Sequence, residues 1–111
     1  MNIGGLGGII FLSFYERGLY DMPKVSIVEK RIFEIEGFQV DITKDGKNVR
    51  GDMQLPKQYE AERMTRNSMT VGDWKNKFRT QYAGYDAVVY KNDGSKASGQ
   101  TKLATVRDTY L

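Results

Sequence analysis

One segment, residues 70–84, constrains the fold of this chain more than any other. The apolar residues that recur in it at spacings of three and four are Val71, Trp74, Phe78 and Tyr82. Thr70 can cap a helix here, and Asp73 can reach back to it in the manner of a capping box. Gly84 stands where a glycine commonly ends a helix. The pattern predicts an amphipathic helix over residues 71–82, and such a helix needs an apolar surface to cover.

Strand signals before and after this segment supply that surface. Residues 25–42 are rich in Val, Ile and Phe, and their alternation changes phase at Gly37. Glycine permits either a bulge or a turn there, and we expect one long bulged strand. Residues 44–47 contain an Asp-Gly pair typical of a tight hairpin, so residues 48–53 should return antiparallel. A further strand is expected over residues 86–91.

The remaining segments complete a small mixed fold. Residues 57–66 have a helix-forming composition, residues 92–95 resemble a turn, and residues 96–100 read as a loop. The ending, residues 101–111, fits a helix capped by Thr101 better than a strand. We therefore predict an α+β fold, in which a small antiparallel sheet is packed on one face by the amphipathic helix.

The chain of 111 residues is long enough for one compact domain, which we place at residues 22–111. Residues 1–21 are interpreted as a leader, with Met22 as an alternative start, or as a docked edge segment built on a strand at residues 9–14. Their apolar run is too short and too rich in glycine for a transmembrane helix, and no secretory signal is evident. We expect a cytoplasmic protein without a membrane partner, and a mobile gene cassette would suit its length.

Two absences exclude large classes of chemistry. The chain has no cysteine and no histidine, which removes thiolate and histidine catalysis and their metal sites, so no cofactor and no metal is expected. Carboxylates remain: Glu34, Glu36 and Asp41 lie on the expected long strand, and Asp108 lies near the end. Glu34 and Glu36 would share a face there and could act as acid and base, but a solvated strand face gives the same pattern. A carboxylate-based enzyme or small-ligand binder is thus kept only as an alternative.

The most credible functional surface is basic and aromatic. Its residues are Arg63, Arg66, Lys75, Lys77, Arg79, Tyr82 and Tyr85. Lysine and arginine can hold phosphates while bases stack on tyrosine rings, so the alternative function is single-stranded nucleic-acid binding. Interleaved acids such as Glu60, Glu62 and Asp73 favour an ordinary solvated helix face instead.

No motif in the sequence points to a named family. A small sheet with one covering helix leaves part of the sheet open, and such sheets commonly pair with a second copy. The sequence therefore favours a small bacterial-type protein without catalytic activity that acts as a homodimeric binding or interaction module.

Overall fold

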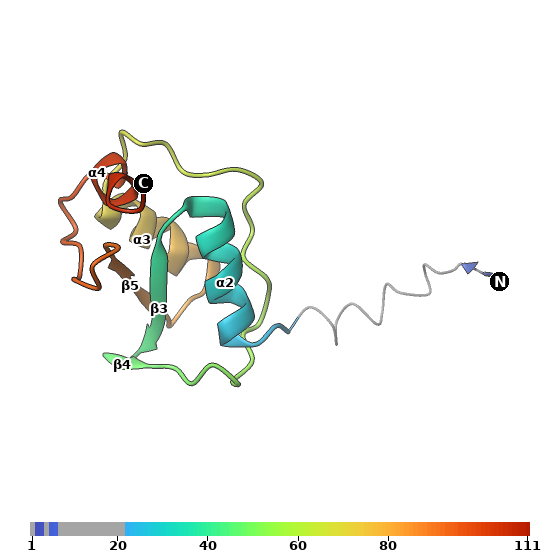
Figure 1. Cartoon of the computed structure of the whole chain (residues 1–111). Coiled ribbons are helices and arrows are strands. Elements are labelled where there is room, and N and C mark those ends of the chain that lie inside the picture. Colours follow the sequence, from blue (N-terminus) through green and yellow to red (C-terminus); the bar gives the residue numbers. More distant parts are fainter. Residues whose placement is uncertain (1, 4, 7–21) are drawn as a thin grey trace.

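The structure is a computed structural model that describes residues 2–3, 5–6 and 22–111. Strands β1 (Asn2–Ile3) and β2 (Gly5–Leu6) form a short parallel pair. Residues 22–111 contain three helices and a three-stranded antiparallel sheet with the strand order β4-β3-β5 (Figure 1). The predicted α+β class is confirmed. The expected edge strand at residues 9–14 lies outside the described residues.

Helix α2 (Val25–Glu36) occupies most of the segment that was expected to be a long strand, so that prediction is wrong. The buried residues of α2 are Val25, Val28, Ile32 and Glu36, which recur at spacings of three and four. Valine and isoleucine favour strands by propensity, but this spacing creates one apolar helical face. Gly37 ends the helix with a φ of 84°, and its N–H donates to the carbonyl of Phe33 at 2.9 Å. The change of phase at Gly37 therefore marks a turn between a helix and a strand.

The sheet begins after that turn. Strand β3 (Gln39–Lys44) lies between β4 (Lys47–Asn48) and β5 (Asp86–Tyr90), and both neighbours are antiparallel to it. Asp45 and Gly46 have φ values of 55° and 79°, as a tight hairpin turn requires, so the predicted hairpin is confirmed. The returning strand is shorter than expected. Beyond Val49 the chain turns toward α2, where the carbonyls of Gly51 and Met53 accept N–H groups from the first turn of that helix.

The predicted helix at residues 57–66 is absent, and this segment belongs to a long irregular connection between β4 and the next helix. Two of its backbone N–H groups are bound by side chains from elsewhere in the fold. The N–H of Glu60 donates to the side-chain oxygen of Gln81 at 2.9 Å, and that of Thr65 donates to the carboxylate of Glu36 at 2.8 Å. Tyr59 is buried within the segment and anchors it to the core. These tertiary contacts override the local helix propensity.

Helix α3 (Val71–Gln81) confirms the strongest prediction from the sequence, including the capping box of Thr70 and Asp73. The ending also forms a helix, α4 (Leu103–Asp108), although Lys102 rather than Thr101 stands at its N-cap. In Figure 1, α2 runs beside β3, and α3 packs against β5. The sheet contributes four side chains to the core beneath these helices: Val40, Ile42, Ala87 and Val89.

The opposite face of the sheet is mostly polar. Its residues, on alternate positions of β3 and β5, are Gln39, Asp41, Thr43, Asp86, Val88 and Tyr90. The hydroxyl of Tyr90 donates to the carboxylate of Asp41 across the strands at 2.7 Å. Among the described residues, no helix is long and apolar enough to cross a membrane.

Candidate functional site

A basic hollow forms where the irregular connection meets α3. The hollow has a volume of about 680 Å³, and its lining residues are Arg63, Met64, Thr65, Arg66, Met69 and Lys77. Five of them come from one stretch of the connection, and Lys77 comes from α3. Three of the seven predicted site residues, Arg63, Arg66 and Lys77, are therefore gathered in one place.

The three cations of the hollow form no ion pair with the acidic side chains that the structure describes. Within residues 22–111, four ion pairs form: Arg50 with Asp52, Lys57 with Glu60, Arg79 with Asp86, and Arg107 with Glu36. None of them includes a cation of the hollow. Its surface therefore presents an uncompensated positive charge to an incoming ligand.

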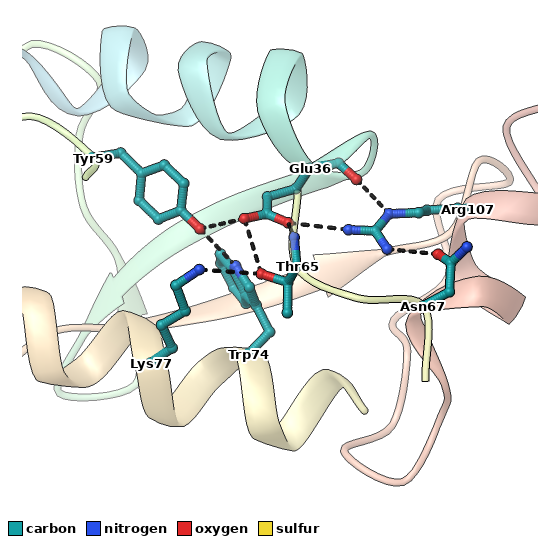
Figure 2. Close-up of polar contacts among 7 residues, drawn as sticks. All are labelled: Glu36, Tyr59, Thr65, Asn67, Trp74, Lys77 and Arg107. Carbon is teal, nitrogen blue, oxygen red and sulfur yellow. Dashed lines mark hydrogen bonds and ion pairs between the residues drawn. The ribbon is translucent and has the colours of Figure 1, made fainter. Parts of the chain in front are cut away.

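A buried carboxylate, that of Glu36, holds Thr65 in the wall of the hollow, and Figure 2 shows the polar contacts around it. Glu36 is fully buried, and its carboxylate accepts the backbone N–H of Thr65 at 2.8 Å and the Thr65 hydroxyl at 3.2 Å. Lys77 reaches the same hydroxyl with its ammonium group at 3.3 Å. Thr65 is thus held between the core and the hollow, and the loop that carries the two arginines is held with it.

Arg107 balances the charge of this carboxylate. Its guanidinium donates to a carboxylate oxygen of Glu36 at 3.0 Å and to the Glu36 backbone carbonyl at 2.6 Å. A third guanidinium nitrogen donates to the side-chain oxygen of Asn67 at 2.7 Å. Burial lowers the pKa of Arg107, and the adjacent Glu36 opposes that shift. This pair joins the C-terminus of α2 to α4 and to the loop below the hollow.

Tyr59 completes the arrangement on the other side. Its hydroxyl donates to Glu36 at 2.6 Å and accepts the indole N–H of Trp74 at 2.9 Å (Figure 2). Burial raises the pKa of Tyr59 far above its ordinary value, and the hydrogen bond to Glu36 raises it further. The hydroxyl therefore stays protonated and serves as a fixed donor. We call Glu36, Tyr59, Thr65, Trp74 and Arg107 the Glu36 network.

The Glu36 network holds the loop in place. Every donor around the carboxylate is already engaged, and Glu36 lines none of the main surface hollows of the described chain. Glu34 and Asp108 are exposed. Because α2 is a helix, Glu34 and Glu36 point in different directions, so the expected pairing of their carboxylates on one strand face is wrong. Among the described residues, no group of three acidic side chains could hold a metal ion.

The other predicted site residues lie apart from the hollow. Successive residues of a helix are about 100° apart around its axis, so Lys75 and Arg79 occupy the flank of α3 opposite Lys77. Arg79 is paired with Asp86 at 3.1 Å and also contacts Asn76. Tyr82 is fully buried against Phe78, and the half-buried ring of Tyr85 lies under the ammonium group of Lys44. Met64 and Met69 also line the hollow but were not among the predicted site residues, although they are interleaved with Arg63 and Arg66 in the sequence.

A second hollow of similar size lies on the other side of the connection. It has a volume of about 630 Å³ and is lined by Arg31, Lys57, Gln58, Tyr59, Glu60, Ala61 and Glu62. Two basic and two acidic side chains offset one another there, and Lys57 and Glu60 form an ion pair at 3.1 Å. This hollow has no preferred sign of charge, so the basic hollow is the better candidate.

The fold and the site together describe a small α+β domain with a basic hollow fixed by a buried carboxylate. No protein-family model, curated protein or solved structure matches the chain.

Proposed function

We propose that the protein is a non-catalytic binding module that takes an anionic partner in the basic hollow. The observation that carries this proposal is the convergence on one hollow of Arg63, Arg66 and Lys77, which form no ion pair within residues 22–111. Guanidinium groups bind carboxylate and phosphate oxygens through two parallel hydrogen bonds, so both kinds of anion match the site.

Single-stranded nucleic acid is the second candidate, because the same three cations suit successive phosphates. The positions of Tyr82 and Tyr85 give this candidate less support than the sequence pattern suggested. Tyr82 is buried, one face of the half-buried Tyr85 ring lies under the ammonium group of Lys44, and neither tyrosine lines the hollow.

The homodimer stays a prediction. One surface considered for it, the open face of the sheet, is lined mainly by polar groups, whereas stable homodimer interfaces are more apolar. The cytoplasmic location likewise remains a proposal. Light scattering on a sizing column measures the mass in solution and would contradict the dimer if only a monomer elutes.

The test of the proposed function compares two variants with the same loss of charge. The hollow variant carries Arg63→Gln, Arg66→Gln and Lys77→Gln. The control variant carries Lys30→Gln, Lys47→Gln and Lys96→Gln, whose side chains are exposed and form no ion pair among the described residues. Circular dichroism first verifies that both variants are folded.

Two fluorescein-labelled probes, an acidic peptide and oligo(dT), are then titrated by fluorescence anisotropy. An exposed ion pair contributes about 0.2 to 1 kcal/mol, so removing three should weaken binding by about 0.6 to 3 kcal/mol, which is about three-fold to 150-fold. The control variant should bind nearly as the unmodified protein does. Equal weakening in both variants would show that only net charge matters, and the proposal would be rejected.

A further inference from the structure

The basic hollow carries apolar side chains as well as charge. Met64 and Met69 line it together with the three cations, and their side chains are 49% and 39% exposed. Exposed methionines on a soluble protein leave unbranched, polarizable groups in water, and such side chains adapt their shape to an apolar ligand. A ligand that offers only phosphates would leave this part of the hollow unused.

The tyrosine side chains closest in sequence to the hollow are not available for stacking with a ligand. Tyr59 and Tyr82 are buried in the core, and no aromatic residue in the described part of the chain lines the hollow. Proteins that bind single strands obtain much of their affinity from bases stacked on such rings. The hollow thus combines arginine forks with flexible apolar surface and lacks aromatic platforms.

We infer that the natural occupant is an acidic peptide segment of a partner protein, in which carboxylates are interspersed with aliphatic side chains. This inference rests on the proposed function and names its partner. The arginines bind the carboxylates, and the methionines cover the aliphatic groups, as the sign and the polarity of the lining residues require.

The Glu36 network prepares the hollow for this role. Glu36 holds both the N–H and the hydroxyl of Thr65, and Arg107 holds Asn67 on the other side of Arg66. The loop is therefore already ordered before the peptide arrives, which lowers the entropic cost of binding. An extended acidic segment needs to order only itself.

The test uses the full chain and three fluorescein-labelled probes of equal charge. The first is a dodecapeptide in which glutamates alternate with leucines, the second has serine in place of each leucine, and the third is an oligo(dT) with the same number of charges. A double variant, Met64→Gln and Met69→Gln, removes the apolar surface and keeps the cations. Because both methionines are exposed, this variant should fold normally.

We expect the leucine peptide to bind at least ten-fold more tightly than either other probe. The methionine variant should lose about five-fold in affinity for the leucine peptide and none for the serine peptide. Equal affinity for the two peptides would overturn the inference, and so would tighter binding of oligo(dT). In those cases the proposed function still stands if the hollow variant loses the binding and the charge-matched control keeps it. Failure of all three probes to bind would overturn both.

Discussion

Tyr59 and Tyr82 form a matched pair of buried tyrosines whose hydroxyl groups have opposite surroundings. The Tyr59 hydroxyl donates to Glu36 and accepts from Trp74, whereas the Tyr82 hydroxyl has no hydrogen-bond partner among the residues that the structure describes. Changing each to phenylalanine removes one oxygen atom and keeps the ring. The structure therefore predicts opposite changes in stability.

The expected magnitudes follow from the cost of unmade hydrogen bonds. Tyr59→Phe removes a bond to a charged acceptor, worth about 1.5 to 3 kcal/mol, and leaves the Trp74 N–H buried without a partner. Glu36 keeps its bonds to Thr65 and Arg107, so we expect a net loss of about 3 kcal/mol in the free energy of unfolding. Tyr82→Phe removes an unsatisfied buried hydroxyl and should raise stability by about 1 kcal/mol.

Thermal unfolding followed by far-UV circular dichroism gives the Tm of both variants. This signal does not depend on the fluorescence of Trp74, whose surroundings change in Tyr59→Phe. For a domain of this size, about 1 kcal/mol corresponds to a Tm shift of about 4 to 8 °C. Tyr59→Phe should melt roughly 12 to 24 °C below the unmodified protein, and Tyr82→Phe a few degrees above it. Similar shifts of the same sign would refute the assignment of the two hydroxyl groups.

Three further predictions concern single side chains. Glu36→Gln should lower the free energy of unfolding, measured by chemical denaturation, by about 3 to 5 kcal/mol because it leaves Arg107 without its buried charged partner. The control Glu34→Gln, at an exposed position, should change it by less than about 0.5 kcal/mol. Gly37→Ala should destabilise the folded protein by about 1 kcal/mol because φ is 84° at this position. Gly37→Asn should destabilise it less, since asparagine tolerates that conformation, and equal losses of stability would count against this explanation. Hydrogen bonds from the backbone and side chain of Thr70 lower the pKa of Asp73 in the folded protein below its ordinary value of 3.8. The stabilisation by the Asp73 carboxylate is therefore present above pH 3.8 and is lost as the pH falls through the pKa of the folded state. Asp73→Asn should therefore flatten the pH dependence of Tm in this acidic range, and an unchanged slope would contradict the capping role of the carboxylate.

The parts of the fold that the sequence predicted are those governed by local rules. The capping box at Thr70 and the Asp-Gly hairpin are set by residues within a few positions of one another, and both were confirmed. The prediction for the α2 segment was wrong because its valines and isoleucines suggested a strand. The spacing of Val25, Val28 and Ile32 was the better signal, and the exposed Phe33 obscured it.

The candidate site was predictable only in part, because long-range contacts assemble it. Arg63, Arg66 and Lys77 were recognised as basic neighbours, but the helical geometry of α3 separates Lys77 from Lys75 and Arg79. The link between Glu36 and Arg107 spans 71 positions, so no local pattern could reveal it. Long-range contacts of Glu60 with Gln81 and of Thr65 with Glu36 likewise explain why residues 57–66 remain irregular despite their helix-forming composition.

Binding of an acidic peptide in the basic hollow can be tested directly by an amide chemical-shift map of the isotopically labelled chain during titration with the leucine–glutamate peptide. We expect the largest shifts to cluster at residues 63–69 and Lys77, with small shifts at Lys75 and Arg79 on the opposite flank of α3. Shifts concentrated on that opposite flank, on the open face of the sheet, or on the second hollow would contradict it.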